Sequence, residues 1–248
     1  MVKLSGFPIF KLLYFYIYMN INSPEFNDNR NYDYSVCENE ERNEYNYISG
    51  LIRPNSKVID LGCGNGSLLY KLIREKNVEA AGIELSKSGV SVCKKKGLNV
   101  VEGRIDEALP FEDNQFDYSI CNVTIQMVRY PEILLSEMKR ISKNLIISFP
   151  NFAFYKNRID LLLKGRMPVP MLFGYSWYST GHIHQLSVKD FWSLVNAVGE
   201  LELKSSYFES SGNTLKDFFI KRFPNLFQVL IIYQLTHTGN STNYVTNK

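Results

Sequence analysis

The sequence predicts an α/β fold in which helices cover both faces of a mostly parallel sheet. Strand-like and helix-like segments alternate along most of the chain, which is the pattern that parallel sheets with crossover helices produce. One strand-like segment, at residues 58–61, ends in a glycine-rich turn and is followed at once by an amphipathic helix. The length of 248 residues and the hydrophobic content of 45% suit one enzyme-sized domain.

The glycine-rich turn reads VIDLGCGNG and spans Val58 to Gly66. Its apolar residues suit a strand buried on both faces, and its alternating glycines let the backbone approach a ligand closely. The dinucleotide fingerprint G-x-G-x-x-G requires a glycine where this chain has Ser67. Asp60, just before the first glycine, also disfavours a pyrophosphate and favours a ligand with positive charge. S-adenosylmethionine, which has an ammonium and a sulfonium group, is such a ligand.

A second acid, Glu84, ends the next strand-like segment, 22 positions after Gly62. An acid about 20 residues beyond a glycine-rich turn lies at the tip of the neighbouring strand, where it accepts hydrogen bonds from ribose hydroxyls. The two acids together favour an S-adenosylmethionine site. The alternative is an ordinary strand–helix–strand unit with a solvated acid in its loop.

The remaining elements follow from local signals. A helix at 45–51 closes before Pro54, Ser86 caps a helix that stops at Gly97, and Pro131 suits the first turn of another helix. Ser187 caps an amphipathic helix near the end of the chain. Besides the first two strands, strands are predicted at 99–102, 116–121, 145–149, 201–207 and 229–235, which completes a seven-stranded sheet.

The domain organisation is predicted as one main unit with two tails. Residues 1–46 form a partly disordered extension, 47–236 the main domain, and 237–248 a disordered tail. The apolar run Phe7 to Ile21 is short for a membrane span and has no small-residue cleavage site after it. Initiation at Met19, a floppy extension and an interfacial anchor remain as interpretations of residues 1–18.

An insertion at about residues 150–184 interrupts the alternation and is a candidate lid over the strand ends. Tyr175, Trp177 and Tyr178 are expected to enclose a small substrate, with Arg166 or Lys164 meeting an anionic group. Plain packing of the aromatic rings is the alternative. His182 and His184 lack a third nearby ligand, so no metal site is predicted.

Net charge and cysteine content indicate which classes of partner and which cellular compartment to expect. The formal net charge of +3, from 28 basic and 25 acidic side chains, gives no global attraction to nucleic acid or anionic lipid. We therefore expect neither nucleic acid nor a membrane as a partner. The four cysteines show no paired spacing, which is typical of a protein in the reducing cytoplasm.

Several longer segments carry a family resemblance. VIDLGCGNGSLL, GIELS and FDYSICN resemble the class I S-adenosylmethionine-dependent methyltransferases over roughly Lys57 to Leu235. QMVRYP, SFPNF, LLLKGRMPV and YSWYSTGHIH closely resemble the methionine biosynthesis protein MetW family, which has a methyltransferase-like fold. The resemblance implies a Rossmann-like seven-stranded fold, S-adenosylmethionine as cofactor, and a role in methionine biosynthesis together with a homoserine O-acyltransferase.

Transferred residue by residue, the resemblance assigns the methionine part of the cofactor to Asp60 and the glycines, and the ribose to Glu84. The implied cofactor-binding residues are Asp60, Gly62, Gly64, Gly66, Glu84, Leu85, Ile105, Asp106 and Asn122. The chain departs from the family pattern at Arg104, where an acid is usual after glycine, and at Ser176 and Ser179. Adenine contact then falls to Asp106 or to backbone amides.

The sequence leaves open whether catalysis occurs. Methyl transfer needs little beyond an acceptor held in line with the methyl group, so catalytic residues leave a weak signal. Gln126, Tyr178 and His184 are candidates for taking a proton from a small-molecule acceptor, and a structural role for His184 is the alternative. A small-molecule methyltransferase and a binding module that supports a partner enzyme both remain.

Overall fold

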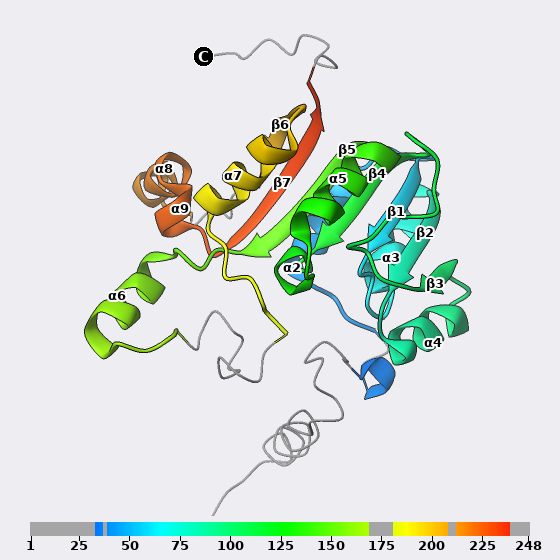
Figure 1. Cartoon of the computed structure of the whole chain (residues 1–248), viewed down its shortest axis with the longest axis horizontal. Coiled ribbons are helices and arrows are strands. Elements are labelled where there is room, and N and C mark those ends of the chain that lie inside the picture. Colours follow the sequence, from blue (N-terminus) through cyan, green and yellow to red (C-terminus); the bar gives the residue numbers. More distant parts are fainter. Residues whose placement is uncertain (1–32, 37–38, 169–180, 208–211, 239–248) are drawn as a thin grey trace, which may run out of the picture.

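The protein, seen here as a computed structural model, is described for residues 33–36, 39–168, 181–207 and 212–238. Its centre is a seven-stranded sheet in the order β3-β2-β1-β4-β5-β7-β6, with helices on both sides (Figure 1). This arrangement confirms the predicted fold class. Tyr175, Trp177 and Tyr178 lie outside the described residues.

Neighbouring strands from β3 to β5 pair in parallel, and β7 runs antiparallel to both β5 and β6. Because β1, β2 and β4 are parallel, their carboxyl ends meet at one edge of the sheet. Val58 to Leu61 are all buried, as expected of a strand covered on both faces. The strands are β1 (Lys57–Leu61), β2 (Glu79–Glu84), β3 (Val100–Glu102), β4 (Phe116–Asn122), β5 (Ser142–Pro150), β6 (Leu201–Ser206) and β7 (Leu230–His237).

The helices begin where the sequence signals them. The Ser86 side chain accepts from the Gly89 N–H, Pro131 opens its helix, and Ser187 forms a reciprocal capping box with Asp190. The described helices are η2 (Tyr34–Val36), α2 (Asn43–Leu51), α3 (Ser67–Lys76), α4 (Lys87–Lys95), η3 (Ile125–Met127), α5 (Pro131–Ile141), α6 (Tyr155–Lys164), α7 (Val188–Val198), α8 (Thr214–Arg222) and α9 (Pro224–Phe227).

The apolar core lies on both faces of the sheet. One cluster joins β4, β5 and β7 to α5 and α7, with the Phe149 and Phe191 ring centroids 4.8 Å apart. A second joins the opposite face to α2 and α3 through Ile48, Leu68 and Leu72. A third, smaller cluster joins α4 to β3. The sheet is therefore held rigid from both sides, which fixes the positions of its strand ends.

Besides the short segments η2, η3 and α9, two longer described helices lie where the sequence analysis assigned none. α6 falls within the proposed lid insertion, and α8 precedes the last strand. Their apolar residues stay largely exposed, so neither helix shows the buried face on which a periodicity argument depends. β5 also begins at Ser142, three positions before the predicted strand.

Candidate functional site

The glycine-rich turn between β1 and α3 forms the floor of a cleft at the carboxyl ends of the strands. Gly62 has φ +84°, and a Cβ there would stand 2.6 Å from Thr124 Cγ2, so the floor has no room for a side chain. The N–H of Gly62 donates to the Ile83 carbonyl at 2.8 Å, which ties the turn to the end of β2. On its other side, Lys96 Nζ donates to the Asn65 carbonyl at 2.9 Å.

Glu84, at the end of β2, lies against this turn. Its Oε2 accepts the Gly64 N–H at 2.8 Å and its Oε1 accepts the Ser86 N–H at 2.7 Å. Burial raises the pKa of Glu84, although these backbone hydrogen bonds favour the ionised form. Each carboxylate oxygen has a second lone pair, so the group remains able to accept hydroxyl protons from a ligand.

Asp60, at the end of neighbouring β1, is 2% exposed. Its Oδ1 has no hydrogen-bond partner within the described part of the chain. The pKa of Asp60 is raised to about 7, chiefly by burial and also by the nearby charge of Glu84, while Arg42 acts in the opposite direction. A buried acceptor without a partner is costly, and a cationic donor beside it would remove that cost.

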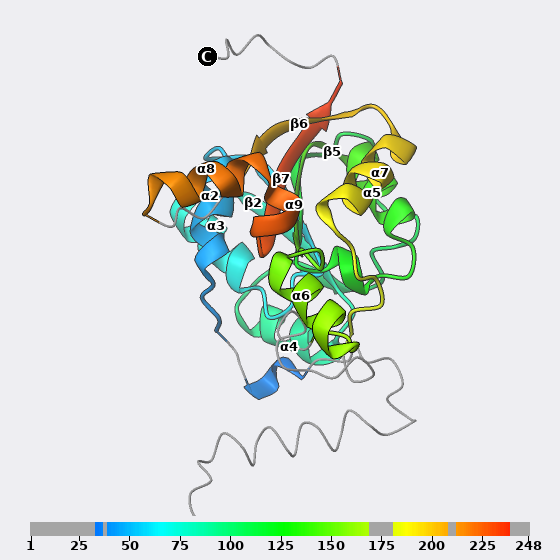
Figure 2. The ribbon, with the colours of Figure 1, turned by 90° about the vertical axis from the view of Figure 1, so that its left-hand side faces the viewer.

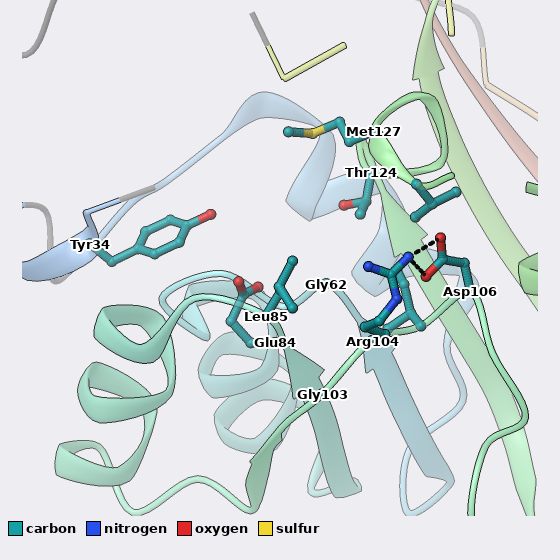
Figure 3. A pocket seen from close by; sticks show the side chains of 11 residues that line it. Tyr34, Gly62, Glu84, Leu85, Gly103, Arg104, Asp106, Thr124 and Met127 are labelled. Carbon is teal, nitrogen blue, oxygen red and sulfur yellow. Dashed lines mark hydrogen bonds and ion pairs between the residues drawn. The ribbon is translucent and has the colours of Figure 1, made fainter. Parts of the chain in front are cut away.

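Glu84 lines a cleft at the carboxyl ends of these strands, whereas Asp60 lies two positions before the lining residue Gly62 without lining the cleft itself. This edge of a parallel sheet is where such folds bind their ligands. Figure 3 shows Glu84 and Leu85 on one side, Arg104 and Asp106 on another, and Met127 above. Predicted site residues Gly62, Glu84, Leu85, Ile105 and Asp106 all line it, together with Tyr34, Gly103, Arg104, Thr124, Met127 and Val128.

The Asp106 carboxylate interacts with other groups of the protein. Its two oxygens lie 2.6 and 2.7 Å from Arg104 Nη2, and its Oδ2 also accepts the Arg129 N–H at 2.7 Å. The carboxylate therefore anchors the turn before α5 and holds the guanidinium at the cleft wall (Figure 3). At this part of the cleft, a ligand can therefore contact the Arg104 guanidinium as well as the Asp106 carboxylate.

Other predicted residues lie around the cleft without lining it. Gly64 and Gly66 continue the turn, and a Cβ on Gly66 would stand 2.8 Å from Cys93 Sγ. Asn122 Oδ1 accepts from Ser148 Oγ at 2.5 Å, between β4 and β5. Arg166 is exposed just beyond α6.

Gln126 and His184 are joined through the backbone. The Gln126 carbonyl accepts the N–H groups of Ile183 and His184, both at 3.0 Å. Gln126 Oε1 and His184 Nε2 are buried and have no hydrogen-bond partner among the described residues. η3, which contains Gln126, also carries the cleft residue Met127.

Tyr34 and Arg104 are cleft residues that the sequence analysis did not assign to the site. η2 packs on α4, the Tyr34 N–H donates to Ser88 Oγ at 3.0 Å, and the phenol reaches over the cleft (Figure 3). Tyr34 belongs to a polar segment with little periodicity, so its position depends on tertiary packing. Arg104 lies in the loop after β3, and at this position the sequence departs from the family pattern.

The sheet order, the glycine-rich turn and the paired acids at adjacent strand ends are those of a class I S-adenosylmethionine-dependent methyltransferase fold. A solved S-adenosylmethionine-dependent methyltransferase from Thermotoga maritima, described as a possible histamine N-methyltransferase, superposes with a TM-score of 0.55 at 18% identity. The superposition covers 90% of this chain and 100% of that one.

The chain belongs to the family of the methionine biosynthesis protein MetW, whose family model matches residues 42–235. The bifunctional methionine biosynthesis protein MetXA/MetW of Rhodopirellula baltica is 37% identical over 144 residues, which are 54% of this chain and 23% of that protein. A demethylmenaquinone methyltransferase of Staphylococcus aureus is 30% identical over 131 residues, 48% of this chain and 54% of that protein. The chain thus spans less than two thirds of the length of these curated relatives.

No described helix combines the length and apolar character needed to cross a bilayer. Nor does the described part of the chain gather three or more His, Cys, Asp or Glu side chains in an arrangement that would hold a metal ion.

Proposed function

We propose that the cleft binds S-adenosylmethionine. The observation that carries this proposal is the pair of buried acids, Asp60 and Glu84, at the ends of adjacent parallel strands beside the cleft. Glu84 would accept hydrogen bonds from the ribose hydroxyls, and Asp60 would meet the positively charged methionine end. The unpartnered Oδ1 of Asp60 and the floor at Gly62, which has no room for a Cβ, both fit such a ligand.

Calorimetric titration with S-adenosylmethionine and with its demethylated product tests this proposal. Glu84→Ala should weaken binding by about 1.5–3 kcal/mol, the scale of hydrogen bonds to a charged group. Glu102→Ala is the matched control, because Glu102 pairs with Glu84 in the sheet register but is exposed and does not line the cleft. Equal affinities for wild type, Glu84→Ala and Glu84→Gln would remove the ribose assignment.

The role of the ligand-binding fold, in this proposal, is to support a homoserine O-acyltransferase in methionine biosynthesis. The support for it is that one polypeptide of Rhodopirellula baltica carries MetXA and MetW together. Co-expression with the acyltransferase should yield a complex, and the acyltransferase should gain thermal stability, because a partner that binds only the folded state stabilises it by mass action. Separate elution of the two proteins at micromolar concentrations would contradict this role.

A small-molecule methyltransferase is the second candidate. Two buried polar atoms favour it: Gln126 Oε1, in η3, and His184 Nε2. Neither atom has a hydrogen-bond partner among the described residues. These atoms would hold the acceptor, while the cofactor supplies an electrophilic methyl group when bound. Turnover of labelled methyl donor with a metabolite extract, abolished in Gln126→Ala and independent of the acyltransferase, is the result that this candidate requires.

A further inference from the structure

Helices α6, α8 and α9 lie at one end of the molecule, and α6 and α8 carry large exposed apolar side chains. Leu162 is 82% exposed and Leu163 is 76% exposed on α6, while Leu215 and Phe218 on α8 are 67% and 59% exposed. Every residue of α8 is at least partly exposed. A nine-residue helix without a buried face is marginal on its own, so this surface lacks the cover that such helices usually have.

Aromatic contacts connect these helices into one surface. The Tyr155 ring of α6 lies 5.9 Å from Phe227 of α9, and Phe227 lies 6.3 Å from Phe219 of α8. Arg158 Nη2 also donates to the Asn225 carbonyl at 3.2 Å, which ties α6 to α9. Figure 2 faces this end of the molecule and shows α6, α8 and α9 on the same side. We call residues 155–166 and 214–227 the helical patch.

The helical patch is strongly basic. It contains seven basic and two acidic side chains, although the whole chain has a net charge of only +3, so the rest of the chain is net negative. The basic residues are Lys156, Arg158, Lys164, Arg166, Lys216, Lys221 and Arg222, and the acidic ones are Asp160 and Asp217. Lys164 pairs with Asp160 at 2.6 Å, and the excess of positive charge remains.

The positive charge of the helical patch argues against a second copy of the chain as its binding partner. A symmetric pair would bring the same basic surface of two chains together, and like charges facing each other oppose association. An apolar surface with a basic rim instead fits a partner with an apolar surface and an acidic rim. Exposed Phe and Arg side chains are also among the residues enriched in the buried centres of protein interfaces.

We infer that the helical patch is the surface on which the acyltransferase docks, through an apolar area bordered by acidic residues. The inference rests on the proposed supporting role. In Figure 1 the patch lies at the left, while β1, β2 and α4, which surround the cleft, lie at the right. A partner bound to the patch would therefore leave the S-adenosylmethionine cleft accessible.

The test measures the affinity of the full chain for the acyltransferase from the same organism. Replacing Leu162 and Leu163 by glutamate should weaken the complex by at least about tenfold, because exposed apolar contacts are exchanged for repulsion from an acidic rim. Lys216→Glu should weaken it and reduce its dependence on salt. Val101→Glu is the matched control, because Val101 is half exposed on β3, at the opposite edge of the sheet.

The outcomes separate a failure of the docking-surface inference from a failure of the proposed supporting role. A complex that forms equally well with the Leu162/Leu163 variant overturns the docking surface and leaves the supporting role intact. The absence of any wild-type complex overturns both. A wild-type dimer, or binding to vesicles of anionic phospholipid, that the same variant abolishes would assign the patch to a second copy or to a membrane and would also overturn the inference. Unchanged S-adenosylmethionine titrations and melting temperatures show that the variants are folded.

Discussion

At the scale of single residues, Asp60 links the cleft to the stability of the fold. An aspartate in an unfolded chain has a pKa of about 3.9, whereas burial raises that of folded Asp60 to about 7. Between these two pH values the folded state binds more protons than the unfolded state. The contribution of Asp60 to the free energy of unfolding therefore falls as pH rises from about 4 to 7.

Asp60→Asn should consequently stabilise the ligand-free protein more at pH 8 than at pH 5, by roughly 1–3 kcal/mol, because the variant buries no charge. Denaturant unfolding of both proteins at the two pH values measures the difference. Other carboxylates also make stability depend on pH, such as Glu137, whose pKa is lowered by its hydrogen bond with Arg140. They contribute equally to the free energy of unfolding of both proteins, so the comparison at each pH cancels their contribution. A difference that does not change with pH would show that Asp60 is ionised throughout.

At the scale of elements, η2 brings a segment that precedes the sheet to the mouth of the cleft. Tyr34 lines the cleft, and its N–H is held by Ser88 of α4. A Cβ on Gly64 would stand 3.1 Å from the Tyr34 hydroxyl, so the phenol also packs closely on the glycine-rich turn. η2 therefore belongs to the cleft, although the sequence groups it with the N-terminal extension.

Two shortened versions of the chain separate the roles of the N-terminal residues. A chain that starts at Met19 should keep the melting temperature and the S-adenosylmethionine affinity of the full chain. A chain that starts at Asn39 should lose affinity by about fivefold, because the Tyr34 ring is removed from the ligand. Calorimetry and thermal melting provide both measurements. Loss of folding in the Met19 version would mean that residues 1–18 are structural, and equal affinity in both would exclude Tyr34 from binding.

The elements that could be predicted are those whose local signals agree with their burial. β1 and β5 contain short apolar runs at residues 58–59 and 145–147, and the caps at Ser86 and Ser187 mark the starts of α4 and α7. The positions of Asp60 and Glu84 at the ends of adjacent strands could be predicted, because their spacing from the glycines follows from the strand–helix–strand unit. Tyr34 could not, because tertiary packing brings it to the cleft, and Asp106 was assigned only through the family resemblance. α8 could not, because its apolar residues face outward.

At the scale of the whole molecule, β4, β5 and α9 connect the cleft with the helical patch. Asn122 at the end of β4 accepts from Ser148 of β5. Beyond β5, the Asn151 side chain donates to the carbonyls of Asn225 and Gln228, at 3.2 and 2.9 Å. Asn151 is fully buried, so it holds α9 firmly against the end of β5. Spatial continuity of this kind permits coupling between the two sites, and only binding measurements establish it.

The last prediction follows from these two sites. If the cleft senses S-adenosylmethionine on behalf of the acyltransferase, saturation with the ligand should change the affinity for the acyltransferase by at least about fivefold. Linkage then requires the acyltransferase to change the S-adenosylmethionine affinity by the same factor. Titrations of each ligand with and without the other measure both factors, and Asn151→Ala should reduce them together because it loosens α9 from β5. Acyltransferase affinity that is identical with and without S-adenosylmethionine would mean that the chain supports its partner without sensing the ligand.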